Sequence, residues 1–282
     1  MSEEWTTIIE PKARLSLGLK ELWHYRDLCM LYVRRNITTQ YKQTILGPLW
    51  FVIQPLLTTV MYMVVFGGIA NIPTDGIPQP LFYLAGISLW NYFSDCLNKN
   101  SNTFTDNAAI FGKVYFPRMV VPIAIIISNL VRLGIQLGLF FIVYGIYQIF
   151  VFHGGIATNW YALLLPLLIV MLAGHSIGFG LLFSSVTTKY RDMQMLMGFI
   201  VTLWMYATPV IYPMSTITNP TLHFVMSLNP ISSIIEAFKY GILGVGEFSW
   251  LSLGYSLAFM LVLLTIGLLT FNKVQRNFMD HV

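Results

Sequence analysis

The string Gly174-His175-Ser176-Ile177-Gly178 matches the G-x-S-x-G pattern of a nucleophile elbow, in which a strand-to-helix turn exposes a reactive serine. Here the string lies inside a long apolar segment that predicts a transmembrane helix. Two glycines four residues apart suit close packing of such helices, and Gly134 and Gly138 repeat that spacing. Helix packing is therefore favoured over nucleophilic catalysis at these positions.

Metal, acid–base and nucleotide chemistry also lack their usual residue patterns. The histidines are isolated, with no H-E-x-x-H and no Cys/His cluster, so we expect no metal site. Asp75, Asp95 and Asp106 do not form the carboxylate cluster that a membrane-embedded transferase requires. Gly112-Lys113 resembles the end of a P-loop, but Val114 replaces the Ser or Thr. We therefore expect no cofactor in this chain and no ATP bound by it alone.

Arg132 is a charge in an unusual place. It lies about 14 residues inside an apolar segment, or about 20 Å at 1.5 Å per residue. An arginine at that depth costs roughly 2.5–3.5 kcal/mol on insertion scales, so something should compensate it. One interpretation is a pore-facing cation that meets a phosphate or sugar hydroxyls. The other is pairing with Asp95 or another internal acceptor, and the sequence leaves both open.

The elements around these residues are membrane helices. Of the 282 residues, 56% are hydrophobic and 10% are charged, against about 25% charged in soluble domains. The charges leave long gaps, and each gap can hold a helix of roughly 20 apolar residues, the length that crosses a bilayer. The sequence predicts an all-α integral membrane protein with six transmembrane helices, near 47–70, 80–98, 119–151, 160–186, 193–212 and 248–271.

Lysine and arginine determine the predicted orientation. Seven precede the first span, and seven more follow the second, fourth and sixth spans, among them Lys99, Lys113 and Lys189. The loops on the other side hold one, Lys239. Since cytoplasmic loops are enriched in these residues, both termini are predicted in the cytoplasm.

Two further segments are expected to lie at the membrane surfaces. Residues 15–37 have an apolar face at helical spacing, interrupted by Arg26, and predict an interfacial helix on the inner side. On the outer side, 213–247 is apolar but broken by prolines. From Ile231 it predicts a short amphipathic helix with Glu236 and Lys239 opposite the apolar face, suited to cover an outer opening.

Four ordered strings carry a family resemblance. They begin with Gln40-Tyr41-Lys42-Gln43-Thr44-Ile45-Leu46-Gly47-Pro48-Leu49-Trp50 followed by Gln54-Pro55-Leu56. Next come Lys113-Val114-Tyr115-Phe116-Pro117-Arg118, then Lys189-Tyr190-Arg191-Asp192 with Ala207-Thr208-Pro209-Val210-Ile211-Tyr212-Pro213, and lastly Asn229-Pro230. From about Leu22 to Gly244 the chain resembles ABC-2-type permeases of the polysaccharide-export group, which carry O-antigen, teichoic acid or related glycans.

The resemblance implies an architecture and partners. It implies a homodimer with a channel along its axis, and two ATP-binding cassette subunits that hold ATP and Mg. The cargo would be an undecaprenyl-linked polysaccharide such as O-antigen, exported across the bacterial inner membrane. No nucleic acid partner is expected. The implied domains are a cytoplasmic region with the interfacial helix (1–46), an ABC-2 type transmembrane domain (47–272) and a cytoplasmic tail (273–282).

The resemblance also assigns provisional roles to residues. The segments 99–118 and 187–192 would face the ATPase, although their charges would equally serve membrane orientation. The aromatics near span ends suit either an interfacial belt or a channel that stacks on sugar rings. The ATPase-coupling candidates are Lys113, Arg118, Lys189, Tyr190, Arg191 and Asp192. The channel candidates come from the residues themselves, because no family string covers Arg132; they are Arg132, Trp90, Phe93, Tyr115, Trp204 and Tyr206. The external gate candidates are Pro213, Pro230, Ile234 and Phe238.

Three alternatives share parts of this pattern. An ABC-2 exporter of a drug or small lipid would have the same topology, but the strings at 115–118 and 190–192 favour polysaccharide. A membrane-embedded glycosyltransferase or acyltransferase needs the missing carboxylate or histidine cluster. A secondary transporter usually places several ionisable residues at the midplane, where this chain offers Arg132 alone.

Overall fold

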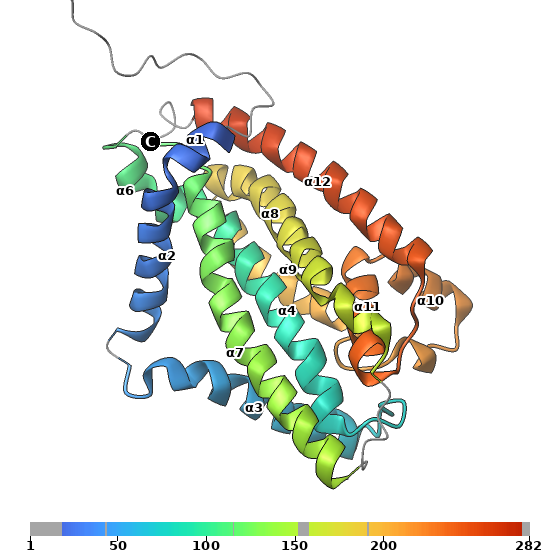
Figure 1. Ribbon diagram of the computed structural model, residues 1–282. Helices are drawn as coiled ribbons and strands as arrows, with labels where there is room; N and C mark the ends of the chain where they lie inside the picture. Colours follow the sequence, from blue (N-terminus) through green and yellow to red (C-terminus); the bar gives the residue numbers. More distant parts are fainter. Residues whose placement is uncertain (1–18, 43, 115, 152–157, 191, 278–282) are drawn as a thin grey trace, which may run out of the picture.

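The computed structural model describes residues 19–42, 44–114, 116–151, 158–190 and 192–277, which form helices joined by turns and loops. Its central part is a row of long helices that pack in the order α12, α8, α4 and α7 (Figure 1). Helix α4 is enclosed on both sides and supplies the largest share of the hydrophobic core. The bounds are α4, Gln79–Ser101; α7, Val120–Phe150; α8, Leu165–Lys189; and α12, Trp250–Asn277.

Four stretches of the described residues are long and apolar enough to cross a membrane, and they coincide with the predicted first, third, fourth and sixth spans. The predicted second span, 80–98, lies within α4. That helix is 23 residues long but carries polar side chains such as Asn91 and Asp95, and its neighbours cover it. The four stretches are Gly47–Ile69, Val120–Phe150, Trp160–Lys189 and Trp250–Gln275.

The predicted fifth span, 193–212, is only partly helical. Helix α9 (Met193–Tyr206) has 14 residues, or about 21 Å of helix, against a hydrocarbon core about 30 Å thick. Turns follow it, and Pro209 lacks the backbone N–H that another helical turn needs. The apolar run therefore continues beyond the helix, and helix length and composition alone do not give six crossings.

The first candidate span consists of three consecutive helical segments. A 3-10 turn, η1 (Gly47–Leu49), leads into α3 (Trp50–Tyr62), and a π-helical stretch, η2 (Met63–Ile69), completes it. Gly47 has a φ of 49°, which glycine adopts without steric cost. The chain changes direction near this residue, and α2 (Arg26–Tyr41) and α3 lie at a wide angle to each other in Figure 1.

The N-terminal helix predicted over 15–37 is two helices in the described residues. Helix α1 (Leu19–His24) ends at His24, and α2 begins after the turn residue Tyr25. Helix α2 packs against α7 and buries Tyr32 and Val33 beside Phe116. Trp23 and Met30, which the prediction placed on the apolar face toward the membrane surface, are largely exposed in this chain. Val33 of the same predicted face is buried, so the contact with α7 covers part of that face and leaves the rest exposed.

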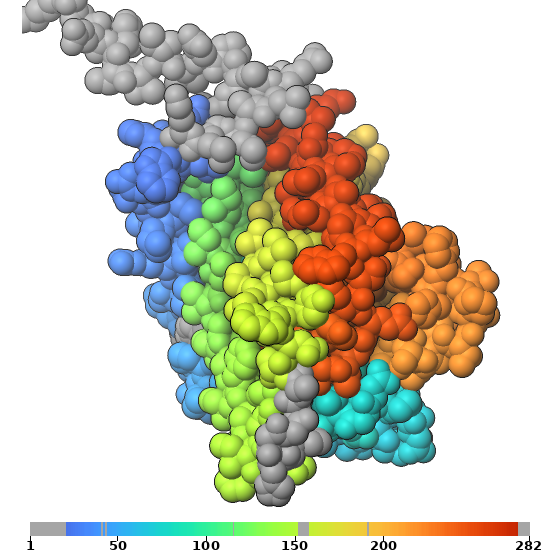
Figure 2. Space-filling model, turned by 45° about the vertical axis from the view of Figure 1, so that its right-hand side comes forward, coloured from blue at the N-terminus to red at the C-terminus, as the bar shows by residue number. Residues whose placement is uncertain are grey.

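The two ends of the molecule differ. At one end lie α1, α6 and the last turns of α12 (Figure 1), with Arg118 Nη1 donating a hydrogen bond to the Gln275 carbonyl at 2.8 Å. Toward the other end lie α10 and α11, and Figure 2 shows the orange segment that contains α10 protruding beside α12. The remaining bounds are α5, Thr103–Asp106; α6, Ala108–Phe111; η3, Trp160–Leu164; η4, Met214–Thr216; α10, Pro220–Ser227; and α11, Pro230–Leu243.

The short helices α10 and α11 begin in the same way, at an Asn-Pro pair. Asn219 Oδ1 accepts hydrogen bonds from the backbone N–H groups of Thr221 and Leu222, and Asn229 Oδ1 accepts one from Ile231. Asparagine at the N-cap and proline at the first helical position favour a helix start. The local sequence thus determines where both helices begin.

Helix α11 is not a surface amphipathic helix, which corrects the prediction for this segment. Glu236 and Lys239, expected on a polar outer face, are 3% and 1% exposed. The apolar residues at 231, 234, 235, 238 and 242 are buried as well, against α4, α8, α12 and η3. The charges are compensated within the protein rather than by water, which the helical spacing could not show.

The paired glycines behave differently in the two helices. Gly174 and Gly178 in α8 face Met260 and Leu263 of α12, where a Cβ atom would come within 2.3 Å and 2.7 Å of those side chains. Gly134 and Gly138 in α7 have nothing within 4 Å of such an atom in this chain. The prediction of helix packing is confirmed for the first pair, whereas the second pair packs against no other segment of the described residues.

Candidate functional site

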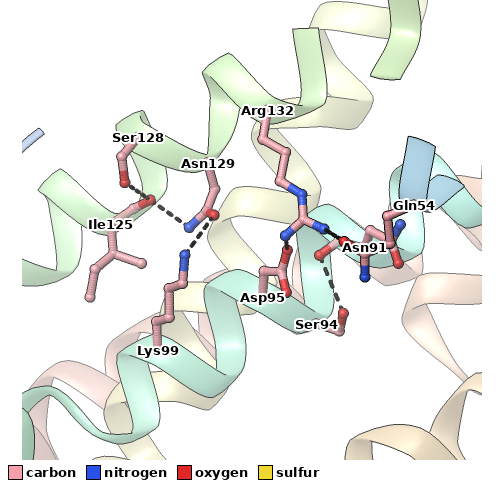
Figure 3. A network of polar contacts seen from close by, with 9 residues as sticks. All are labelled: Gln54, Asn91, Ser94, Asp95, Lys99, Ile125, Ser128, Asn129 and Arg132. Atoms are coloured by element: carbon pink, nitrogen blue, oxygen red, sulfur yellow. Dashed lines mark hydrogen bonds and ion pairs between the residues drawn. The ribbon is translucent and has the colours of Figure 1, made fainter. Parts of the chain in front are cut away.

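A polar network crosses three helices in the region predicted to lie in the membrane (Figure 3). Arg132 of α7 donates from Nη1 to Asp95 Oδ2 of α4, and from Nη2 to Gln54 Oε1 of α3 at 3.0 Å. The Arg132 Cζ atom lies 5.3 Å from the centroid of the Phe51 ring. The arginine is therefore paired with Asp95, one of the acceptors considered for it, and it links α3 to α4 through α7.

A second branch of the network lies one helical turn away. Lys99 Nζ donates to Asn129 Oδ1 at 3.2 Å, and Asn129 Nδ2 donates to the Ile125 carbonyl at 2.8 Å. Ser128 Oγ donates to the same carbonyl at 2.9 Å. Lys99, predicted as a loop residue, thus lies in the last turn of α4.

The network is partly open to the outside of the chain. The side chains of Arg132 and Asp95 are 14% and 29% exposed, and Gln54 is exposed. Asn91 and Ser94 of α4 are half-buried beside them (Figure 3). We call Gln54, Asn91, Ser94, Asp95 and Arg132 the polar strip. Exposed polar groups at membrane depth normally face a protein neighbour or a water-filled path rather than lipid.

A cavity of about 300 Å³ adjoins the second branch. It lies between α2 and the bundle, and Arg35, Lys99, Asp106 and Asn107 are among the residues that line it. Burial raises the pKa of the Asp106 carboxyl above its ordinary value. The cavity has two cationic side chains and one carboxylate, a composition suited to an anionic group.

The channel candidates do not all lie on a surface. Trp90 and Phe93 are buried in the core, and Phe93 meets Trp204 edge to face with centroids 5.3 Å apart. Neither Trp90 nor Phe93 presents a ring face for sugar stacking in this chain. Tyr206 is exposed, and Trp204 is half-buried. Tyr115 lies outside the described residues.

The ATPase-coupling candidates gather near the end of the molecule where α8 ends and α6 lies (Figure 1). Lys113, Lys189, Tyr190 and Asp192 are exposed there. Gln194 Nε2 of α9 donates a hydrogen bond to Thr105 Oγ1 of α5 at 2.7 Å. This bond joins α5, which precedes Lys113, to α9, which follows Asp192.

Two members of the coupling set stand apart from the exposed ones. Arg118 is turned toward the protein, where it binds the end of α12 and lies over the rings of Phe104 and Phe111. Arg191 lies outside the described residues.

The external gate candidates are buried: Pro213, Pro230, Ile234 and Phe238 all lie inside the protein. Sequence reasoning missed the polar contacts beside them. Lys239 Nζ donates to the Pro209 carbonyl at 2.5 Å and lies 3.6 Å from the centroid of the Phe82 ring. Asn229 Nδ2 donates to the Ala207 carbonyl at 2.9 Å and to Thr208 Oγ1 at 2.8 Å.

A spacing signal could have revealed most of the network. Asp95 and Lys99 are four residues apart on α4, and Asn129 and Arg132 are three apart on α7, so each pair shares a helix face. Two polar pairs on two membrane helices would predict one contact between them. For Gln54, the only indication of a role in the sequence was its position beside Pro55 in one of the four family strings.

Comparisons with known proteins place the chain in a family. The family described as ABC-2 type transporter matches residues 27–243. An O-antigen export system permease protein RfbA from Klebsiella pneumoniae is 26% identical over 94% of this chain and 99% of its own length. RfbA from Myxococcus xanthus is 27% identical over 78% of this chain and 82% of its own. The polysialic acid transport protein KpsM from Escherichia coli is 26% identical over 83% of this chain and 88% of its own.

The matched region, 27–243, runs from α2 to the end of α11 and contains the polar strip, the exposed coupling residues and both short helices after α9. The match covers well over half of the chain, and the helical architecture agrees with it. This protein belongs to the ABC-2 type transporter family.

Proposed function

We propose that this chain is the permease subunit of an ABC transporter that exports a lipid-linked polysaccharide such as O-antigen across the bacterial cytoplasmic membrane. The observation that carries the proposal is the near end-to-end alignment with a protein named as an O-antigen export permease, over 94% of this chain. A second relative is named for polysialic acid transport, so long glycans are common to both. In this proposal ATP and Mg are bound by a separate subunit, and this chain contains no cofactor.

The proposed topology has six crossings with both termini in the cytoplasm. The four long apolar stretches supply four of them. Helix α4 would be the second, shielded from lipid by its neighbours, and α9 with the turns after it would be the fifth. Helices α10 and α11 would form an external gate region, and α2 would be the interfacial helix. The domains would be 1–46, 47–272 and 273–282.

The polar strip supports a homodimer with a path along its axis. The strip is partly exposed on one face between α3, α4 and α7, and covering it with lipid would leave polar groups without hydrogen-bond partners. A second copy facing it would enclose a polar route for the glycan. Arg132 would then meet phosphate or sugar hydroxyls from the wall of the path, while Asp95 neutralises it between transport events.

The exposed charges near the ends of α6 and α8 support a docking site for the ATPase. Lys113, Lys189 and Asp192 are exposed beside the linked α5 and α9 segments. A partner that moves these residues would move α8, which packs against both α4 and α12. Hydrolysis in the partner would thus change the packing around the path.

The test is purification of the tagged chain from its native host in mild detergent, with mass spectrometry of the proteins that accompany it. The proposal expects a Walker-A ATPase at equal stoichiometry and loss of a surface glycan when the chain is deleted. Lys189→Glu should lower ATPase recovery at least about tenfold through charge reversal, while the exposed Lys42→Glu, outside the coupling set, should leave it unchanged. Repeated purification without an ATPase, or an unchanged surface glycan after deletion, would refute the proposal.

A further inference from the structure

A second cavity, of about 230 Å³, lies near α11 and the start of α12. Ser232 and Ser233 of α11, Ser249 before α12, Glu236, Glu247 and His223 are among the residues that line it. Hydroxyl and carboxylate groups thus come from three separate segments to one space. The residues assigned to the channel, coupling and gate are not among its lining residues.

Two deeply buried polar atoms at this cavity lack hydrogen-bond partners. Ser232 is 2% exposed, and its Oγ atom has no hydrogen-bond partner in the described part of the chain. Glu236 Oε1 likewise accepts no hydrogen bond there, while Oε2 accepts one from the Glu247 backbone N–H at 3.0 Å. Because an unsatisfied buried polar group costs free energy, such atoms at a cavity indicate a polar occupant.

The two carboxylates at the cavity already have partners among the described residues. Glu236 Oε1 lies 3.9 Å from Lys239 Nζ, and Glu247 Oε2 lies 3.2 Å from His223 Nε2. An added cation would have to compete with Lys239, and an added anion would face two carboxylates. The arrangement therefore favours a neutral occupant with several hydroxyl groups.

A sugar ring has the matching chemistry. Its hydroxyls donate to a carboxylate oxygen and exchange hydrogen bonds with serine hydroxyls, which can both donate and accept. Met214 in the lining supplies an apolar contact for the C–H groups of the ring. The backbone also approaches the carboxylate closely, because Gly246 has a φ of 103° and a Cβ there would lie 2.6 Å from Glu236 Oε2. The absence of a side chain at this position lets the Glu247 backbone N–H reach Glu236 Oε2 and hold it in place.

We propose that the cavity lined by Ser232, Ser233, Glu236 and Glu247 binds one neutral sugar residue. The inference rests on the proposed function, because a polysaccharide passing the α10–α11 end supplies such residues in series. The site would hold the emerging chain briefly at this end and hinder its return. Its weak hydrogen bonds would let each residue be replaced by the next.

The test uses the purified full-length chain in detergent with a cysteine reporter, Ser249→Cys, at the exposed edge of the cavity. Cys96 is buried and Cys29 is half-buried, so the parent chain measures background labelling. The probes are methyl glucoside, methyl mannoside and rhamnose as neutral sugars, glucuronate as an anion, and Ca²⁺. A neutral sugar should slow modification by a charged thiol reagent, and Ser232→Ala should weaken that protection about two- to tenfold.

Two variants separate binding from folding. Glu247→Gln changes a more exposed lining residue and should also weaken protection. Ser256→Ala removes a buried hydroxyl that donates to the Pro230 carbonyl at 2.8 Å and is not in the lining, so it should leave protection unchanged. Equal effects of Ser232→Ala and Ser256→Ala would overturn the inference, as would protection by Ca²⁺ or glucuronate in place of neutral sugars.

The outcome also separates this inference from the proposed function. If deletion of the chain removes the surface glycan but no neutral sugar protects the reporter, the inference fails and the exporter proposal stands. If deletion leaves the surface glycan intact, the exporter proposal fails and the inference fails with it. Protection together with glycan loss supports both.

Discussion

Two ion pairs among the described residues lie largely away from water, and they are built differently. Arg132 and Asp95 come from α7 and α4 and remain 14% and 29% exposed. Glu236 and Lys239 are three residues apart on α11, and their side chains are 4% and 1% exposed. The first pair joins helices at the polar strip, whereas the second lies within one helix.

The difference lies in what each pair holds together. Arg132 contacts α3 and α4 directly, so its own hydrogen bonds cross-link the bundle. Lys239 acts through a further contact, the Pro209 carbonyl, which anchors α11 to the turn after α9. A pair within a helix can thus still determine how that helix docks. The partly exposed pair keeps access to a passing ligand, and the enclosed pair does not.

The largest expected effect comes from breaking the enclosed pair. Lys239→Met leaves Glu236 buried without its cation, which should destabilise the fold by about 3–5 kcal/mol. The variant should accumulate poorly and elute as aggregate in fluorescence-detected size-exclusion chromatography. The double variant Lys239→Met/Glu236→Gln should recover much of the folded peak, because no uncompensated charge remains. A double variant no better than the single one would show that the pair is not the cause.

Breaking the partly exposed pair, Arg132 and Asp95, should lower the stability of the fold less than breaking the enclosed pair and should reduce glycan export more. Arg132→Ala removes hydrogen bonds to Asp95 and Gln54, a loss of about 1.5–3 kcal/mol, and should leave a folded, purifiable chain. Surface glycan measured in the same cells should fall at least about tenfold. Asp95→Asn combined with Arg132→Ala tests coupling by thermal unfolding. Strictly additive shifts in unfolding temperature would contradict the direct contact.

Arg132→Lys sharpens the distinction between charge and geometry. Lysine keeps the positive charge but cannot present the two-nitrogen fork that reaches Asp95 and Gln54 together. We expect assembly close to the parent chain and an intermediate loss of export, about two- to fivefold. Gln54→Ala should produce a similar change, since it removes the same second contact. Full export in both variants would mean that charge alone matters at this position.

Substitution of Asp106 should have the smallest effect. Asp106 is a single acidic group, whereas the substitutions above each change an ion pair or its contacts. Because burial raises its pKa, the folded state binds a proton more readily than the unfolded state. Its contribution to stability is present below about pH 4 and is lost as pH rises through the folded-state value. Asp106→Asn should therefore raise the unfolding temperature slightly at pH 7, by under about 2 °C, and not at pH 4. An equal shift at both pH values would contradict this origin.

The charge gaps located the long apolar helices, because exclusion of charge from a bilayer is a property of composition alone. The predicted fifth span runs on to 212, although α9 stops at Tyr206 before Pro209, and the sequence could not show that α2 buries Tyr32 and Val33 beside Phe116. The burial of these α2 side chains depends on neighbours distant in the chain. The helical spacing in α11 was read correctly, but the burial of Glu236 and Lys239 was not. Their compensation comes from Pro209 and Glu247, which no local pattern connects to them.

In the proposed topology, where α4 is the second crossing, its polar character has a consequence for how the chain enters the membrane during synthesis. An aspartate at a helix centre disfavours insertion by about 2.5–3.5 kcal/mol, which is an upper bound for Asp95, and its partner Arg132 is 37 residues further along the chain. While the ribosome translates these residues, Asp95 in α4 lacks its positively charged partner, Arg132 of α7. The insertion machinery should therefore retain α4 until α7 arrives and release the two helices into lipid as a pair.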